Sequence, residues 1–133
     1  MAMVDQKEGL PTSVYIDSAS PHEVMLVEKT LDESFMEQEP IELLGDKGFD
    51  SNDLDDKLFC ERGLELIAPE RKNKKEPRHT SEDFQNYQHR WKVERFFAWL
   101  QNFRRVATRW DYYAENYLGF IQLACMLMLL KRL

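Results

Sequence analysis

The middle of the chain alternates between short β-rich runs and a helical pattern, and this alternation constrains the fold more than any other feature. Residues 41–44 (IELL) and 64–68 (LELIA) are apolar runs of strand length. The segment between them has a helix pattern that begins at Asp50 or Ser51 as N-cap and is closed by Gly63. Two strands joined through a helix pair in parallel within one sheet. The sequence therefore predicts an α/β fold rather than a helical bundle.

The N-terminal segment predicts a hairpin followed by a helix. Residues 1–4 and 12–16 are β-rich and flank a turn-forming stretch, so we expect them to pair. Ser20 is the expected N-cap of a helix that continues to about Phe35, because Pro21 occupies the first helical position and a Glu lies three residues after the cap. The residues expected to face inward on this helix are Val24, Val27, Leu31 and Phe35.

The C-terminal half predicts two more helices. Residues 70–79 form a polar, mostly basic loop, and Thr80 is the expected N-cap of a long helix that runs to about Phe103. Residues 104–113 read as a break or bend, and residues 117–133 as the last helix. This last helix is very apolar but too short to cross a bilayer comfortably, so we expect it to be buried in the core.

The expected long helix has two distinct faces. At about 100° per residue, one face is apolar and would pack on a core; it comprises Val93, Phe96, Phe97, Leu100 and Phe103. A second face, roughly a quarter turn away, carries Tyr87, Arg90, Glu94 and Gln101. This arrangement presents a carboxylate at the edge of a core. The same spacing also fits a plain surface helix whose Arg90–Glu94 pair contributes only about a few tenths of a kcal/mol.

Size and composition fit a single globular domain. The chain has 133 residues, of which 43% are hydrophobic and 12% aromatic, enough to build a core. Cys60 and Cys125 lie in apolar helical contexts, so we interpret both as reduced, buried residues of a cytoplasmic protein. Residues 1–11 lack the basic and apolar segments of a signal peptide.

Charge is unevenly distributed along the chain. Residues 1–61 contain 4 Lys and Arg against 16 Asp and Glu, whereas residues 62–133 contain 14 against 8. The overall charge of −6 argues against a nucleic-acid partner. The asymmetry, however, predicts a localised polyanion-binding surface on the C-terminal half. The alternative is that two solvated faces of opposite sign attract each other within the fold.

Asp46 is the first candidate for a catalytic or metal-binding group. It follows the strand-like run 41–44 at its carboxyl end, where α/β sheets collect their ligand-binding groups. Gly45 and Gly48 flank it and allow a sharp turn and a close approach. Together with Glu94 from a helix packed on the sheet, it would make an oxygen site suited to Mg²⁺ or Mn²⁺. Taken alone, an Asp in an Asp-Lys-Gly sequence is more simply a turn-forming residue.

Four segments carry motifs that are specific in combination: SASPHEVMLVEKTL, LLGDKGFDS, LIAPERKNK and YQHRWKVERFFAWLQNFRRVATRWDYYAENYLGFIQLACML. Together they resemble the DDE-class transposases of bacterial insertion sequences, over nearly the whole chain from about Met3 to Leu130. The resemblance implies a ribonuclease H-like fold in which two Asp and one Glu bind two divalent ions. It also implies a function in DNA transposition, by metal-dependent DNA cleavage and strand transfer.

The resemblance assigns roles to individual residues. Asp46 matches the second catalytic Asp and Glu94 the catalytic Glu, so both would bind Mg²⁺ or Mn²⁺. Tyr87 and Arg90 match the family's Tyr, Arg, Glu, Lys spacing and would position the DNA backbone near the scissile phosphate. The final Lys position of that spacing is Gln101 in this chain, which departs from the family pattern.

The resemblance further predicts an incomplete catalytic domain. In the family, the first catalytic Asp lies on a first, central strand, which precedes a hairpin, and residues 1–16 match the second half of that hairpin. Asp5 and Asp17 match other positions and are poor substitutes. Two carboxylates hold one Mg²⁺ weakly and would not hold a pair of ions in register. We therefore expect residues 1–133 to form one domain, the C-terminal portion of the catalytic domain, which is inactive alone. It would be a decayed remnant, or a second reading frame completed by the upstream half of the transposase.

Basic residues of the C-terminal half are the expected DNA contacts. Each phosphate that they neutralise makes binding more dependent on salt. The candidates are Arg71, Lys72, Lys74, Arg104 and Arg105, together with Tyr87 and Arg90. Trp91 and Trp110 would stack on an extruded base, although a Trp on such a helix is more commonly a core residue. The expected partners are DNA, at the element ends and the target, and further copies of the transposase in the active complex.

Three other functions fit the same sequence. A non-catalytic DNA-binding or regulatory fragment would compete with the full enzyme for the element ends and would not nick DNA. A protein-interaction module would dock residues 117–133 on a partner and leave the acidic half in solvent. A nuclease of the same fold would need a third acid from residues 1–61 close to Asp46 and Glu94.

Overall fold

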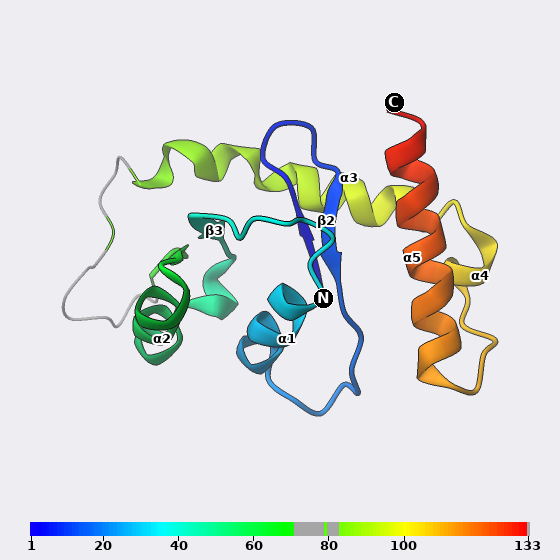
Figure 1. Cartoon of the computed structure of the whole chain (residues 1–133), viewed down its shortest axis with the longest axis horizontal. Coiled ribbons are helices and arrows are strands. Elements are labelled where there is room, and N and C mark those ends of the chain that lie inside the picture. Colours follow the sequence, from blue (N-terminus) through cyan, green and yellow to red (C-terminus); the bar gives the residue numbers. More distant parts are fainter. Residues whose placement is uncertain (71–78, 80–82, 133) are drawn as a thin grey trace. The chain divides into compact units, whose positions relative to one another are not determined.

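The computed structural model of the chain describes residues 1–70, 79 and 83–132, and it forms two compact units. The hairpin unit comprises Met1–Met36 and Trp91–Leu133, and the α/β unit comprises Glu37–Arg90. The α/β unit is therefore inserted within the sequence of the hairpin unit. Figure 1 shows the elements of both units along the chain.

The α/β unit is built from a parallel strand pair and the helix that joins it. Strands β3 (Glu42–Leu44) and β4 (Glu65–Ile67) pair in parallel, with Leu43 opposite Leu66. Helix α2 (Asn52–Arg62) connects the two strands and packs on β4 (Figure 1). The parallel strand–helix–strand unit predicted from the sequence is confirmed.

Two residues fix the ends of α2 where the sequence places them. The Ser51 Oγ accepts a hydrogen bond from the Leu54 N–H at 3.4 Å, as an N-cap does. Gly63 closes the helix in the left-handed conformation, with φ 64°. The apolar side chains that this unit buries are Leu54, Leu58, Leu64, Leu66, Ile67 and Ala68.

The hairpin unit packs a strand pair and its helices around one core. Strands β1 (Ala2–Val4) and β2 (Pro11–Val14) pair antiparallel, which confirms the predicted hairpin. The α-helices of this unit are α1 (Val27–Asp32), α3 (Trp91–Leu100), α4 (Arg104–Ala107) and α5 (Ala114–Leu130). Helix α3 contacts β1, helix α5 contacts β2 and α3, and α4 lies beside α5 (Figure 1).

The core of the hairpin unit draws on segments that are far apart in the sequence. Its buried members are Val14, Phe96, Leu100, Ile121, Ala124, Cys125 and Met128. Phe96 is completely buried, and burying a ring of this kind contributes about 2–3 kcal/mol. Because these side chains come from β2, α3 and α5, neither the hairpin nor either helix buries its apolar face alone.

The first helix begins later than predicted. Its first turn is the 3₁₀ helix η1 (Glu23–Leu26), which leads into α1. The N-cap is His22, whose Nδ1 accepts a hydrogen bond from the Val24 N–H at 3.4 Å. The predicted cap at Ser20 is therefore wrong. The imidazole two residues further on supplies the acceptor that the first turn needs.

The same helix also ends earlier than predicted. Helix α1 stops at Asp32, because the chain that follows pairs with the hairpin. Ser34 forms an isolated bridge with Ser13, and the Phe35 N–H donates to the Thr12 carbonyl at 2.8 Å. Phe35 is consequently outside the helix and 41% exposed, so its predicted inward position is wrong.

The long helix predicted to reach Phe103 is divided. The segment Asp83–Arg90 is the 3₁₀ helix η3, and α3 begins at Trp91 and ends at Leu100. After α3, the Phe103 N–H donates a hydrogen bond to the Leu100 carbonyl at 3.0 Å. The Phe103 backbone is extended, and its side chain packs against the core. The predicted cap at Thr80 lies outside the described residues.

Several aromatic side chains of this region are more exposed than predicted. Phe96 and Leu100 take the core side of α3, so the neighbouring Phe97 remains 44% exposed. Trp91 is 48% and Trp110 is 69% exposed. The core interpretation of both tryptophans is therefore wrong.

The two cysteines differ in their environments. Cys125 is buried in the hairpin unit, and this burial raises the pKa of its thiol to about 11. Cys60 is exposed, so its predicted burial is wrong. Leu54 and Leu58 form the buried side of α2, and Cys60, two residues after Leu58, falls on the opposite side of the helix.

The mixture of helices and strands fits the predicted α/β class. Within the described residues the strands form two sheets of two strands each, β1–β2 and β3–β4. The ribonuclease H-like assignment and the absence of its central strand stay predictions. Among the helices that the structure describes, none combines the length and apolar character needed to cross a bilayer.

Candidate active site

Asp46 lies directly after β3 and begins a tight turn. Its Oδ1 accepts a hydrogen bond from the Gly48 N–H at 2.7 Å and so caps the 3₁₀ helix η2 (Lys47–Phe49). At Gly45 an added Cβ would lie 2.9 Å from the Phe49 Cβ, so the turn requires glycine there. Asp46 is exposed. One carboxylate oxygen of Asp46 therefore stabilises the turn, and the residue lies at the carboxyl end of a parallel strand pair.

Tyr87 and Arg90 lie together in η3. The Arg90 guanidinium is 5.9 Å from the centre of the Tyr87 ring, within cation–π range. Residues three apart eclipse each other in a 3₁₀ helix, which has three residues per turn. The two side chains therefore share a face, as predicted, although the helix type differs from the α-helix that the prediction assumed.

Glu94 lies in the first turn of α3 and is exposed. The same helix is fixed on another side by the β1–β2 turn. The Lys92 Nζ donates to the Lys7 carbonyl at 2.9 Å, and the Arg95 guanidinium donates to the Glu8 carbonyl. Glu94 therefore has a set position relative to the hairpin.

A stack of aromatic and cationic side chains adds to this fixation. The Arg95 guanidinium lies 4.6 Å from the Trp91 ring centre and 4.7 Å from that of Trp99. The Arg132 guanidinium, two residues after the end of α5, lies 5.9 Å from the Trp99 ring centre. The exposed Trp91 is thereby engaged with Arg95, on the surface of α3.

The predicted site residues are distributed over both units. Asp46, Tyr87 and Arg90 belong to the α/β unit, and Glu94 belongs to the hairpin unit. The approach of Asp46 to Glu94 therefore stays a prediction. Among the described residues, no group of three or more His, Cys, Asp or Glu is placed to hold a metal ion.

The predicted DNA-binding arginines differ in how they are engaged. Arg104 is exposed in the first turn of α4. The Arg105 Nη1 lies 3.8 Å from the Asp111 Oδ1, and its guanidinium lies 5.2 Å from the Phe120 ring centre. Arg71, Lys72 and Lys74 lie outside the described residues.

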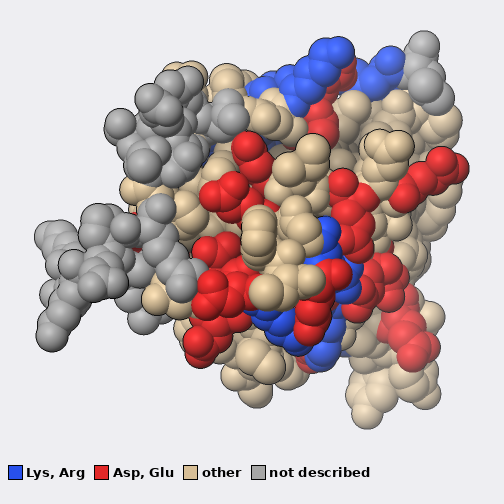
Figure 2. Space-filling view, turned by 60° about the vertical axis from the view of Figure 1, so that its left-hand side comes forward, with Lys and Arg blue, Asp and Glu red and all other residues tan. Residues whose placement is uncertain are grey.

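Figure 2 shows several groups of acidic side chains on the surface, interspersed with basic ones, and the N-terminal half of the sequence is the more acidic half. Two acids of that half have local roles. Asp5 accepts hydrogen bonds from the backbone N–H groups of Glu8 and Leu10 in the β1–β2 turn. Asp17 pairs with Lys29 at 3.0 Å, and this hydrogen bond lowers the pKa of its carboxyl.

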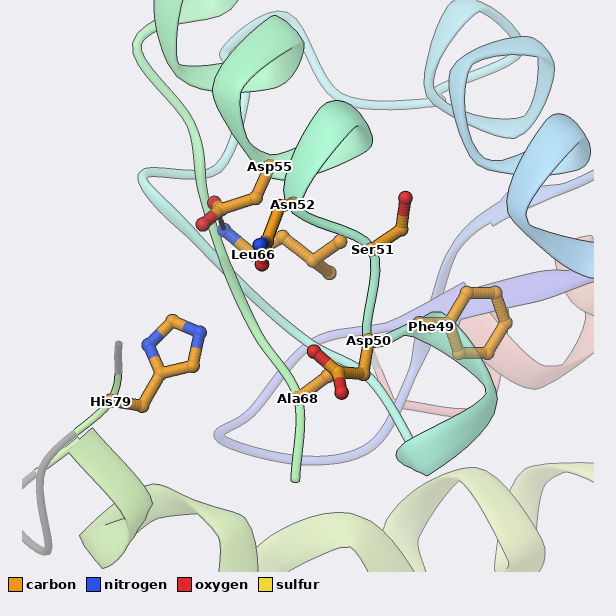
Figure 3. Close-up of a pocket in the computed structure, with 8 residues that line it drawn as sticks. All are labelled: Phe49, Asp50, Ser51, Asn52, Asp55, Leu66, Ala68 and His79. Atoms are coloured by element: carbon orange, nitrogen blue, oxygen red, sulfur yellow. Dashed lines mark hydrogen bonds between the residues drawn. The ribbon is translucent and has the colours of Figure 1, made fainter. Parts of the chain in front are cut away.

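A small polar pocket in the α/β unit was not predicted. Its lining residues are Phe49, Asp50, Ser51, Asn52, Asp55, Leu66, Ala68 and His79. Figure 3 shows Asn52 and Asp55 at the start of α2 and His79 on the other side of the pocket. The Asp55 Oδ1 accepts a hydrogen bond from the Leu66 N–H at 3.2 Å, which ties α2 to β4.

This pocket holds about 10 Å³ of space, enough for one water molecule and too little for a substrate. Its polar residues cluster around a helix start, where Asp, Ser and Asn are common for capping alone. Their spacing therefore carried no specific signal in the sequence.

Comparison with known proteins gives two matches. The sequence model of the family described as "Transposase DDE domain" matches residues 1–129. A protein of Burkholderia cepacia named "Putative transposase for insertion sequence element IS402" is 31% identical over 91 residues, which are 68% of this chain and 39% of that protein. The chain therefore spans less than half the length of this curated relative. No solved structure matches the chain.

Proposed function

This chain belongs to the family of transposase DDE domains, and from that premise we propose that it acts in DNA transposition as part of a catalytic domain. Asp46 and Glu94 are two of the carboxylates that bind the divalent ions. The observation that carries this proposal is the place of Asp46, directly after β3 at the carboxyl end of a parallel strand pair. Ligand-binding groups of α/β sheets collect at such ends.

The placement of Glu94 supports the same role. It is exposed on α3, whose opposite side is anchored by the buried Phe96 and Leu100. Lys92 and Arg95 hold the hairpin turn against the same helix. The backbone that carries Glu94 is therefore held in place, which supports its use as a ligand of a catalytic ion.

The donor chemistry of these two residues fits Mg²⁺ or Mn²⁺, because both ions prefer carboxylate oxygens. When bound, the ions would stabilise charge on the phosphate and lower the pKa of a bound water. In our proposal Asp46 and Glu94 hold one ion weakly, and a third carboxylate from the upstream half of the transposase completes the set. The ribonuclease H-like fold, with that carboxylate on its central strand, is part of the same proposal.

Tyr87 and Arg90 are proposed to hold the DNA backbone beside these carboxylates. Their stacked arrangement in η3 presents a cation and a phenol from the same face. Arg104 is exposed and is the clearest candidate for a further phosphate contact. Arg105 would have to exchange its contact with Asp111 for a phosphate. Arg71, Lys72 and Lys74 are proposed as contacts from their sequence alone.

The direct test measures Mg²⁺-dependent cleavage of an element-end DNA duplex. The chain is compared with a longer protein in which the upstream half of the transposase is joined to it. We expect cleavage only by the joined form. In that form, Asp46→Asn and Glu94→Gln should each reduce the rate at least about 100-fold, because a ligand of the ion is lost.

Matched controls are Asp53→Asn in α2 and Glu33→Gln after α1, because both carboxylates are exposed and lie in the same units as the residues they control for. Both controls should leave the cleavage rate unchanged. Cleavage by the separate chain would refute its proposed incompleteness. Salt-dependent DNA binding by the joined form without any nicking would instead support a non-catalytic DNA-binding function.

A further inference from the structure

Three side chains of α3, those of Trp91, Arg95 and Trp99, form a stack along one side of the helix, which we call the Arg95 stack. The Arg95 guanidinium lies 4.6 Å from the Trp91 ring centre and 4.7 Å from that of Trp99. It also donates a hydrogen bond to the Glu8 carbonyl of the β1–β2 turn. Its buried Nε has no hydrogen-bond partner among the residues that the structure describes. Two rings and one carbonyl therefore hold this guanidinium.

The spacing of the Arg95 stack fits the α form of the helix and not the 3₁₀ form. Its members lie four residues apart, and four residues of an α-helix turn through about 400°, which returns to within about 40° of the starting direction. Four residues of a 3₁₀ helix turn through about 480°, so the side chains would point about 120° apart. Both cation–π contacts therefore depend on the α form, and each contact stabilises it.

The segment before Trp91 has the opposite match between spacing and helix type. Tyr87 and Arg90 lie three residues apart in the 3₁₀ helix η3, and their side chains stack at 5.9 Å. Three residues make one full turn of a 3₁₀ helix. The helix type changes at Trp91, which is the first member of the Arg95 stack. The side-chain contacts before and after this change therefore each agree with the local helix type.

The helix type decides where the Glu94 carboxylate lies. Glu94 is in the first turn of α3, and Phe96, two residues later, is completely buried in the core. With Phe96 fixed, a first turn in the 3₁₀ form would rotate Glu94 by about 40° around the helix axis, because the two forms differ by about 20° per residue. At the outer radius of a helix, about 5–6 Å, this rotation moves the carboxylate by about 4 Å. A divalent ion that holds its ligands at about 2 Å would lose such a ligand.

We propose that Arg95 is a positioning residue: its stack keeps the first turn of α3 in the α form and so fixes the direction of the Glu94 side chain. This inference rests on the proposed function of Glu94 as a ligand of a divalent ion. Lys92 provides a contrast on the same helix. Its Nζ donates to the Lys7 carbonyl of the same hairpin turn at 2.9 Å, but it is not part of the stack. Loss of the Lys92 contact should loosen the turn and leave the helix type unchanged.

The first measurement is the helix type of the chain without metal, by NMR. Nuclear Overhauser contacts from an α proton to the amide proton two residues later mark the 3₁₀ form, and contacts four residues later mark the α form. Arg95→Gln removes the cation at nearly equal helix propensity, so the 3₁₀ contacts should spread from η3 through Glu94. The matched control Lys92→Gln should keep the α contacts. A first turn that stays α-helical in Arg95→Gln overturns the proposal.

The second measurement is the dissociation constant of Mn²⁺, from the electron paramagnetic resonance signal of the free ion. Arg95→Gln should raise this constant about tenfold, as the loss of a group that orients a metal ligand does, and Lys92→Gln less than about twofold. Glu94→Gln separates this inference from the proposed function. An affinity that depends on Glu94 and not on Arg95 overturns the role of Arg95 alone. An affinity that Glu94→Gln leaves unchanged overturns the proposed function, and the positioning role with it.

Two variants of Trp91 keep the test decisive if Arg95→Gln fails to fold, which circular dichroism would reveal. Trp91 is 48% exposed, so its replacement leaves the core in place. Trp91→Phe keeps a ring on which Arg95 stacks, and it should retain both the α form and the Mn²⁺ affinity. Trp91→Leu removes the ring and should lose both, although Leu has the higher helix propensity of the two replacements. Equal behaviour of the two variants would contradict the stack as the cause.

Discussion

The two units of this chain are assembled from different kinds of information. The strands and helix of the α/β unit come from one continuous segment, with a serine cap and a glycine stop that act locally. The hairpin unit joins the first 36 residues to the last 43, and its core combines side chains from β2, α3 and α5. Local signals therefore suffice for α2 and its strands. The hairpin unit depends on contacts between distant segments.

The largest expected effect on stability comes from the core of the hairpin unit, which depends on distant segments. Phe96→Ala removes a completely buried ring and should lower the free energy of unfolding by about 3–5 kcal/mol. Phe97→Ala, on the adjacent and 44% exposed residue, should cost less than about 1 kcal/mol. Denaturant unfolding measures both values. Equal losses would mean that the core does not lie where α3 meets β2 and α5.

Two glycines with positive φ offer a second, smaller contrast. Gly9 has φ 71°, and an added Cβ would lie 2.8 Å from the Arg95 Nη2 and 3.0 Å from the Lys92 Cβ. Gly63 has φ 64° with open space around it. Gly9→Ala should therefore cost about 2–4 kcal/mol, and Gly63→Ala about 1–2 kcal/mol. Thermal unfolding of the two variants tests the order, and a larger loss at Gly63 would contradict the packing of α3 on the hairpin turn.

Helix caps give a third contrast, which separates what was predicted from what was missed. Ser51→Ala removes the cap of α2 and should cost about 1 kcal/mol. Ser20→Ala should cost almost nothing, because His22 is the residue that caps η1. Amide exchange in the first turn of each helix reports the effect. Loss of protection after Ser20→Ala would instead support Ser20 as the N-cap, as predicted from the sequence.

The smallest effect concerns the surface pair in the hairpin unit. The hydrogen bond from Lys29 lowers the pKa of the Asp17 carboxyl, followed by that from the Ser18 N–H. A carboxyl whose pKa is lower in the folded state than in the unfolded state stabilises the fold at pH values above its unfolded-state pKa of about 3.9. That stabilisation is lost as the pH falls through the pKa of the folded state. Asp17→Asn should therefore flatten the acid limb of stability slightly. Titration of the Asp17 carboxyl by NMR checks the direction, and an upward shift would contradict the pairing.

The sequence was informative where a feature is fixed by its neighbours in the chain. The parallel strands, the Ser51 cap and the Gly63 stop all follow from residues within one segment. It misled where a distant segment decides, as at Phe35, which is drawn out of its helix by the strand containing Thr12. Helical periodicity alone also could not show that the expected long helix would change from 3₁₀ to α form at Trp91.

The same distinction between local and distant determinants applies to the candidate site. The stacking of Tyr87 with Arg90 follows from their spacing within one helix. The local turn at Asp46 follows from its glycines, which the sequence shows. The pairing of Asp46 with Glu94 would bring together residues of two units, and it rests on the place of Asp46 after a strand and on the family resemblance rather than on a local sequence signal. It is consequently the claim that most needs a measurement of its own.

That measurement is the broadening of backbone amide signals in the NMR spectrum when a small amount of Mn²⁺ is added to the chain. If Asp46 and Glu94 hold one ion together, signals around Gly45–Gly48 and around Trp91–Arg95 should broaden in parallel, and Asp46→Asn should abolish both effects. Broadening confined to one of these segments, or unchanged at Glu94 after Asp46→Asn, would contradict a shared ion site.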